Sequence, residues 1–205
     1  MLTHFNKFLK LSKRYSMIQN LSVEKNKIIK VIPFNELLLE DSSLSLFQKT
    51  LLVTDGTVTD LLRLYTQKEI TVEKINQEIA LSGKEESKLC EYETPILKRE
   101  ILLGNEKENY VYANSVFIFE NMSRKSQYAL LETDRPIGLL WKEERVDTFR
   151  DIIEIRTELC DDLTSFFDVK QGTVFLARTY IIYNNLKTLG MITEKFPITY
   201  FNEKL

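Results

Sequence analysis

Histidine is nearly absent from this chain of 205 residues, because it occurs once, as His4. This count excludes hydrolases that use an imidazole base and helical zinc sites with paired histidines. Two cysteines, Cys90 and Cys160, are too few for a metal cage or a disulfide scaffold, and such a low number is typical of a reducing compartment. Any catalysis is therefore expected to use carboxylates, arginine, lysine, tyrosine or main-chain groups, without a metal.

Other features are also scarce. The chain has only 6 glycines and 4 prolines, no glycine-rich phosphate loop, and no apolar run of the roughly 18 to 20 residues that cross a bilayer. Its 28 basic and 30 acidic side chains give a net charge of -2, which provides no global basic field for phosphates. We therefore expect a folded protein that binds neither membrane nor nucleic acid and whose partner is a small molecule.

The length predicts one domain, over 33–205, preceded by an N-terminal extension, 1–32. Residues 1–23 contain basic side chains but no acid, a composition that fits either a transit segment or a plain solvated extension. Lysine, asparagine and isoleucine are plentiful, as in proteins of AT-rich genomes such as those of plastids. The expected location is the plastid (chloroplast) stroma, or the cytoplasm if the protein is bacterial.

Helical patterns dominate the first half of the domain. Short helices are expected over 35–40 and 44–52, and Thr57 with Asp60 resembles a capping box that opens a helix over 58–66. Thr71 precedes a further helical stretch to about Leu81, ended by Gly83.

The second half alternates with a period of two. Strands are predicted over 96–103 and 110–119 around a polar loop, 104–109, and then over 146–156, 173–183 and 189–196. A short helix over 126–131 and a turn over 134–138 lie between them. Helices first and antiparallel strands later predict an α+β fold.

Three charged side chains fall on apolar strand faces. Arg99 alternates with Leu97, Ile101 and Leu103, while Arg178 and Glu194 share the apolar faces of their own strands. A buried charge without a partner costs several kcal/mol, so each of the three requires one. One interpretation is a structural Arg178–Glu194 ion pair, with Arg99 extending to the sheet edge. The other is an interior pocket in which arginine binds a ligand carboxylate.

The last two predicted strands suggest how these charges meet. If Tyr183 faces Leu189 across a loop over 184–188, counting back along the hairpin places Arg178 opposite Glu194. Both side chains are then expected on one inward face, lining the same pocket as Arg99.

Six segments together resemble the chorismate lyases (chorismate pyruvate-lyases), including their cyanobacterial and red-algal plastid relatives. They are Thr54-Asp-Gly-Thr-Val-Thr-Asp-Leu-Leu, Leu97-Lys-Arg-Glu-Ile-Leu-Leu103, Arg135-Pro-Ile-Gly138, Arg150-Asp-Ile-Ile-Glu-Ile155, Arg178-Thr-Tyr-Ile181 and Thr193-Glu-Lys-Phe-Pro197. The resemblance implies a single antiparallel sheet of about six strands, helices packed over it, and a pocket closed by helical flaps. It also implies cofactor-free conversion of chorismate to 4-hydroxybenzoate and pyruvate, a step of quinone biosynthesis.

The resemblance also implies roles for individual residues. Arg99 corresponds to the clamp of the ring carboxylate, and Glu194 to the carboxyl group that contacts the ring oxygen. Ile137 would offer its main-chain N–H. Val58, or Thr57 one position earlier, corresponds to a residue that lines the pocket from the flap.

Chorismate carries two carboxylates, and Arg99 with Arg178 is expected to bind them. Glu194 could then protonate the departing oxygen or only orient the substrate. The alternative function is a non-catalytic domain of the same fold that binds a small aromatic carboxylate. The sequence does not indicate an oligomeric state.

Overall fold

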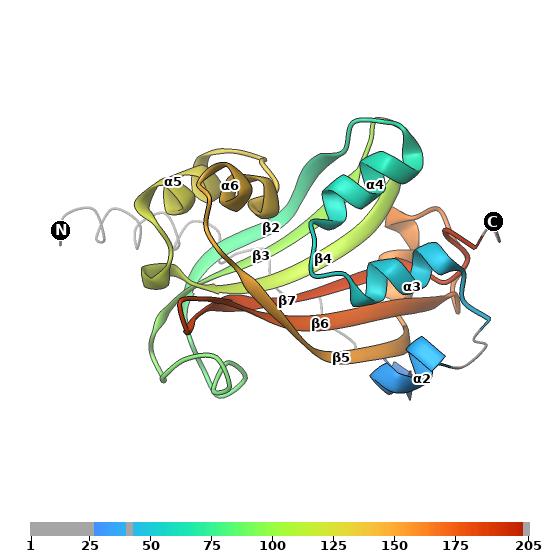
Figure 1. The fold of residues 1–205 in the computed structure, drawn as a ribbon, viewed down its shortest axis with the longest axis horizontal. Helices are drawn as coiled ribbons and strands as arrows, with labels where there is room; N and C mark the ends of the chain where they lie inside the picture. Colours follow the sequence, from blue (N-terminus) through green and yellow to red (C-terminus); the bar gives the residue numbers. More distant parts are fainter. Residues whose placement is uncertain (1–26, 40–42, 203–205) are drawn as a thin grey trace.

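Seven antiparallel strands form one sheet in the computed structural model, which describes residues 27–39 and 43–202 (Figure 1). The strand order across the sheet is β1-β5-β6-β7-β4-β3-β2. The predicted α+β fold is confirmed, with one strand more than the six expected. The strands are β1 (Lys27–Val31), β2 (Thr71–Leu81), β3 (Pro95–Gly104), β4 (Asn109–Ile118), β5 (Phe149–Leu159), β6 (Val174–Asn184) and β7 (Lys187–Pro197).

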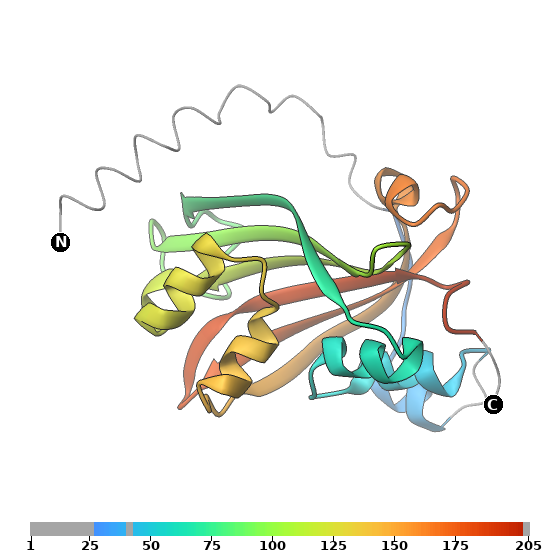
Figure 2. The same cartoon turned by 90° about the horizontal axis from the view of Figure 1, so that it is seen from above.

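Two groups of helices cover the same face of this sheet (Figures 1 and 2). The α3–α4 group lies over one end and the α5–α6 group over the other. None of the described helices is long and apolar enough to cross a membrane. The helices are α2 (Phe34–Leu39), α3 (Leu46–Val53), α4 (Val58–Thr66), α5 (Arg124–Glu132) and α6 (Ile137–Glu143), with short 3-10 turns over Phe119–Asn121 and Asp161–Phe166.

The segment from Thr71 to Leu81 is the edge strand β2, so the helix predicted there is wrong. A bulge between Lys74 and Asn76 interrupts the alternation of the strand. The apolar residues Val72, Ile75 and Ile79 consequently recur at spacings of three and four, which imitates a helical face.

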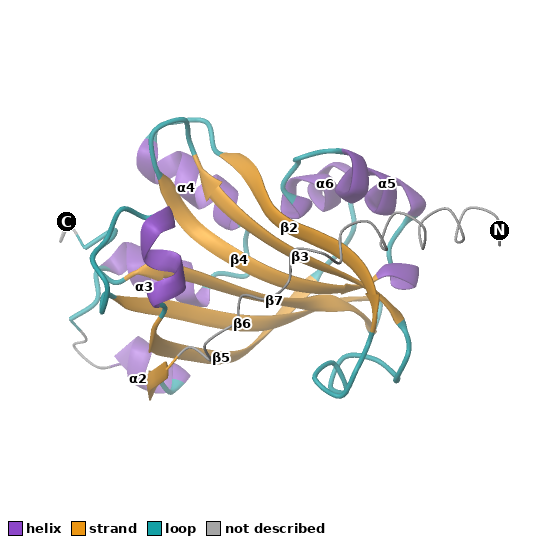
Figure 3. Ribbon diagram, turned by 180° about the vertical axis from the view of Figure 1, so that it is seen from behind, coloured by secondary structure: helices purple, strands orange, loops and turns teal. Residues whose placement is uncertain are grey.

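The opposite edge of the sheet begins inside the predicted extension. β1 pairs with β5 from Lys27 to Val31, and Figure 3 shows it at the edge opposite β2. The sheet therefore starts at Lys27, inside the predicted extension of residues 1–32. The rest of that predicted extension, 1–26, lies outside the described residues.

The hairpin of β6 and β7 has the predicted pairing of its two charges. Arg178 lies directly opposite Glu194, whereas Tyr183 pairs with Thr188 rather than Leu189 because the register shifts between Ile182 and Tyr183. The turn is shorter than the predicted loop over 184–188: Asn184 already pairs with Lys187 across the two residues between them.

The two helix groups meet at the starts of α4 and α6. The helix predicted over 58–66 is confirmed as α4, but the capping box is not, because the Thr57 side chain makes no capping hydrogen bond. Asp60 instead accepts a hydrogen bond from Lys142 of α6 at 3.1 Å. The turn predicted over 134–138 runs directly into α6, a helix that the sequence pattern did not indicate.

Candidate functional site

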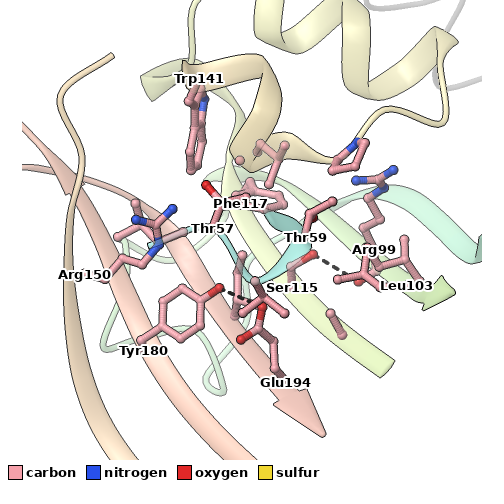
Figure 4. A pocket seen from close by; sticks show the side chains of 18 of the residues that line it. Thr57, Thr59, Arg99, Leu103, Ser115, Phe117, Trp141, Arg150, Tyr180 and Glu194 are labelled. Carbon is pink, nitrogen blue, oxygen red and sulfur yellow. Dashed lines mark hydrogen bonds between the residues drawn. The ribbon is translucent and has the colours of Figure 1, made fainter. Parts of the chain in front are cut away.

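A pocket lies between the helix-covered face of the sheet and the first turns of α4 and α6 (Figure 4). Strands β3, β4, β5, β6 and β7 form its floor and walls, and the two helix starts form its roof. The sheet contributes Arg99, Ile101, Leu103, Ala113, Ser115, Phe117, Arg150, Tyr180, Ile182, Ile192 and Glu194, and the roof contributes Gly56, Thr57, Val58, Thr59, Pro136, Ile137, Gly138 and Trp141. Five of the six predicted site residues line this pocket.

Arg99 projects into the pocket from the middle of β3. The residue is only 2% exposed, so it does not extend to the sheet edge. Its Nε and Nη2 atoms are buried without a hydrogen-bond partner in the described part of the chain. Burial lowers the pKa of the guanidinium to about 10, an effect opposed by the charge of Asp134. A buried cation with unused donors is a site for an anion.

Glu194 lines the pocket from β7, on the other side from Arg99 in Figure 4. Its Oε2 accepts a hydrogen bond from Arg178 Nε at 2.7 Å, and its Oε1 accepts one from the Tyr180 hydroxyl at 3.2 Å. Burial, followed by the charge of Glu194, raises the pKa of Tyr180, so this hydroxyl stays protonated and donates. The carboxylate is therefore held in one orientation by two neighbours.

Arg178 supports the pocket without lining it, which differs from the prediction. The side chain is 1% exposed and lies beneath the α3–α4 connection, where Nη1 donates to the Thr54 carbonyl at 2.8 Å. Burial alone would lower the pKa of Arg178, but the charges and hydrogen bonds of Glu194 and Tyr180 together raise it above its ordinary value. The Arg178–Glu194 ion pair is thus both structural and part of the site, since its carboxylate faces the pocket.

Arg150 is a second arginine of the pocket, contributed by β5. Figure 4 places it across the pocket from Arg99, on the side of Tyr180. Its side chain is 12% exposed, and Nη1 lies 3.6 Å from Asp55 Oδ1 in the loop before α4.

The roof is formed by close contact between the two helix starts. A Cβ on Gly138 would stand 3.0 Å from Thr57 Cγ2, so α6 approaches α4 this closely because Gly138 has no side chain. Both Thr57 and Val58 line the pocket. The main-chain N–H of Ile137, in the first turn of α6, donates to no acceptor among the described residues.

An aromatic wall closes one side. Phe117 and Trp141 meet edge to face, with ring centroids 6.1 Å apart. Glycine is required opposite them, because a Cβ on Gly190 would stand 2.3 Å from the Val116 carbonyl oxygen and 2.7 Å from the Phe117 ring. This wall fits a flat, apolar ligand body.

Three residues of the pocket, Tyr180, Arg150 and Trp141, are not among the site residues predicted from the sequence. Tyr180 shares an apolar strand face with Arg178, which was a usable signal. Arg150 stands in one of the six family-like segments, but a bulge between Ile152 and Glu154 obscures which face of β5 it occupies. Trp141 belongs to α6, which was not predicted.

The arrangement suits a rigid aromatic or diene acid. Cationic donors lie on two sides, a fixed carboxylate accepts hydrogen bonds at one end, and the walls between them are apolar. Within residues 27–39 and 43–202, no group of three or more histidine, cysteine or acidic side chains is placed to hold a metal.

Sequence comparisons match this chain to lyases. The model of the Rv2949c-like chorismate pyruvate-lyase family matches residues 52–204. The protein MJ0807 of Methanocaldococcus jannaschii, provisionally named a lyase, is 32% identical over 157 residues, which cover 74% of this chain and 78% of that protein. A chorismate pyruvate-lyase of Mycobacterium leprae is 28% identical over 113 residues, 52% of each chain.

Solved structures match in fold. The protein PhnF of Mycobacterium smegmatis superposes with a TM-score of 0.56 over 92% of this chain and 93% of its own, at 10% identity. Its effector domain alone gives a TM-score of 0.57 over 71% of this chain and 90% of that domain, also at 10% identity. At this identity the likeness concerns the fold alone.

Proposed function

Because the chain belongs to the Rv2949c-like chorismate pyruvate-lyase family, we propose that it cleaves chorismate to 4-hydroxybenzoate and pyruvate. The observation that carries the proposal is Arg99, a buried guanidinium with unused donors, which faces a fixed carboxylate across an apolar pocket. The Arg99 guanidinium matches a carboxylate at one end of a flat ring, and the Glu194 carboxyl group matches a hydroxyl at the other end.

The ring carboxylate of chorismate would bind Arg99, whose planar guanidinium can donate two parallel hydrogen bonds. The free N–H of Ile137 in the roof is a further donor for this carboxylate. The ring would lie against Phe117 and Trp141, and its hydroxyl would reach Glu194. This orientation uses every predicted site residue that lines the pocket, with Thr57 and Val58 above the ring.

The surroundings of Glu194 favour an orienting role over proton donation. Its two oxygens already accept hydrogen bonds from Arg178 and Tyr180, which fix the orientation of the carboxyl group. A carboxyl group held in this orientation at the pocket wall can accept a hydrogen bond from the substrate hydroxyl. Glu194 would thus fix the ring so that the carbon bearing this hydroxyl is positioned for reaction.

The proposed reaction is an elimination that needs no oxidant. The bond between the ring and the ether oxygen of the enolpyruvyl group breaks, and the hydroxyl-bearing ring carbon loses its hydrogen. The ring becomes aromatic, and the enolpyruvyl methylene gains a hydrogen to give pyruvate. Aromatisation drives the step, so positioning and removal of water are the main tasks of the protein.

Incubation of the purified protein with chorismate tests this function. We expect equimolar 4-hydroxybenzoate and pyruvate, measured by chromatography and by a coupled dehydrogenase assay, at rates proportional to protein concentration. The Arg99→Ala variant is the matched control. Binding of chorismate without either product would instead favour the alternative function, a non-catalytic protein that binds an aromatic carboxylate.

For its cellular setting, we propose quinone biosynthesis in the plastid stroma, or in the cytoplasm if the source is bacterial. The lysine-rich composition and the acid-free residues 1–23 support this proposal. Immunolabelling of the protein in its source cell tests the proposal, because label in the plastid stroma is expected and label in the cytosol of a cell that contains plastids would contradict it.

A further inference from the structure

We propose that Arg150 binds the second carboxylate of chorismate, the one on the enolpyruvyl side chain; this inference rests on the proposed function. It assigns to Arg150 the role that the sequence analysis gave to Arg178. The structure removes Arg178 from that role because this residue does not line the pocket. Its guanidinium lies beneath the pocket, where it donates to Glu194 and to the Thr54 carbonyl.

The position of Arg150 in the pocket fits the geometry of chorismate. In chorismate the enolpyruvyl ether is attached next to the hydroxyl-bearing carbon and away from the ring carboxylate. A group that binds the side chain must therefore lie near Glu194, at the end of the pocket opposite Arg99. Arg150 lies on that side in Figure 4, and it is close enough to Tyr180 for its positive charge to favour the phenolate form.

The Arg150 guanidinium also has hydrogen-bond donors available for a ligand. The Arg150 side chain donates from Nη1 to the Asp55 carbonyl, and its main-chain N–H donates to Asp55 Oδ1 at 3.2 Å. Nε and Nη2 make no hydrogen bond to the described residues. These contacts fix the guanidinium while leaving donors for a ligand, which is the arrangement expected of a carboxylate site.

The charges of the side chains around the pocket also favour a dianionic ligand. Two guanidinium groups, Arg99 and Arg150, line the pocket, while the charge of Glu194 is already balanced by Arg178. Asp55 neutralises Arg150 only weakly, because its side chain is 60% exposed and solvated. The side chains that line the pocket thus include two guanidinium groups whose acidic neighbours, Asp55 and Asp134, lie outside the lining, and two such cations match a dianion better than a monoanion.

The inference separates substrate from product. Chorismate has two carboxylates, whereas 4-hydroxybenzoate keeps only the ring carboxylate. Arg150 should consequently contribute to the binding of chorismate and not to that of 4-hydroxybenzoate, while Arg99 should contribute to both. Once the ether bond breaks, the attraction of Arg150 acts on pyruvate alone.

The test compares Arg150→Met and Arg99→Met for two ligands. For Arg150→Met we expect kcat/KM for chorismate to fall about 100-fold, while the calorimetric Kd of 4-hydroxybenzoate changes less than about threefold. Arg99→Met should weaken both. Arg124→Met removes an exposed arginine of α5 and controls for the loss of one charge. Arg150→Lys should recover part of the activity, which shows that a loss in the methionine variant is not misfolding.

Two outcomes overturn the inference: an Arg150→Met variant that keeps its wild-type kcat/KM, or one in which chorismate and 4-hydroxybenzoate are weakened equally. Failure of the proposed function looks different, because the wild-type protein then forms no product. In that case the Kd of chorismate, measured by calorimetry in the same variants, still decides whether Arg150 recognises the second carboxylate.

Discussion

Arg99 is a buried cation that the folded protein stabilises less well than water does. Burial lowers its pKa from the ordinary 12.5 to about 10. Below pH 10 the folded and unfolded chains are both protonated, so the folded state carries the full cost, on the order of 3 kcal/mol. Between about pH 10 and 12.5 the folded state loses this proton first, and stability rises with pH. A bound anion relieves the same cost at neutral pH.

We therefore predict that Arg99→Met abolishes turnover while raising the Tm of the free protein by several degrees. Removal of a destabilising buried charge produces the gain, and loss of the carboxylate clamp produces the inactivity. Thermal unfolding with and without 4-hydroxybenzoate measures both effects, because the ligand should raise the Tm of the wild type and not that of the variant. A variant that unfolds at a lower temperature and still responds to the ligand would contradict this role.

Glu194 differs from Arg99 because it already has a protein partner. Glu194→Gln would leave the buried guanidinium of Arg178 without its counter-charge, a loss of about 3 to 5 kcal/mol. Inactivity of this variant would therefore be ambiguous. Tyr180→Phe is the sharper change, since it removes one hydrogen bond to Glu194 and leaves the ion pair intact.

For Tyr180→Phe we predict a fall in kcat of about tenfold with little change in KM, and a stability loss of about 1 kcal/mol. The hydroxyl restrains Glu194 and does not itself bind the ring carboxylate, so orientation should suffer more than affinity. Steady-state kinetics and urea unfolding measure the two quantities. An unchanged kcat would show that the orientation of Glu194 does not depend on Tyr180.

Among the secondary-structure elements, the starts of α4 and α6 control the roof of the pocket. They touch at Thr57 and Gly138, where an added Cβ would stand 3.0 Å from Thr57 Cγ2. The exposed Lys142–Asp60 pair joins the same two helices and contributes less than about 1 kcal/mol. Packing at Gly138, rather than this ion pair, is therefore what holds the roof together.

We predict that Gly138→Ala lowers kcat/KM for chorismate about tenfold, because overpacking of about 1 to 3 kcal/mol pushes the two helix starts apart. Thr57→Ser removes the methyl group that the new Cβ would meet. The double variant should consequently regain most of the activity that Gly138→Ala loses, with Thr57→Ser alone as the reference, since Thr57 itself lines the pocket. Steady-state kinetics of the wild type, the two single variants and the double variant form a double-mutant cycle. If the double variant recovers no activity, the contact between residue 138 and the Thr57 methyl group is not the cause of the loss.

At the scale of the whole molecule, the sequence predicts the central strands well and the edges poorly. Strands β3, β4, β6 and β7 are buried on both faces or alternate cleanly, so their charged residues identify the pocket face directly. The edge strand β2 is half-solvated and bulged, and β1 has no buried side chain, so neither shows a clear period. The short helix α6 lacks a side-chain cap, and the roof it forms was therefore not predictable.

The same limit applies to the site. Alternation shows which strand face a residue occupies, and this was enough to place Arg99, Glu194 and Arg178 on one face. It does not show which part of that face the helices cover. Arg178 lies under the α3–α4 connection, whereas Arg150 lies in the open pocket, and only the packing of the helices separates these two arginines.

The chemistry of the whole pocket predicts that activity does not depend on a divalent metal. The proposed elimination balances without an oxidant, and both substrate carboxylates are matched by arginines instead of a cation. We expect kcat/KM for chorismate to be unchanged after dialysis against EDTA. EDTA is itself a polyanion and can compete for Arg99 and Arg150, so the control is EDTA saturated with calcium at equal ionic strength. Activity that falls only with free EDTA and returns with Mg²⁺ or Zn²⁺ would show that a metal, and not the arginine pair alone, organises the substrate.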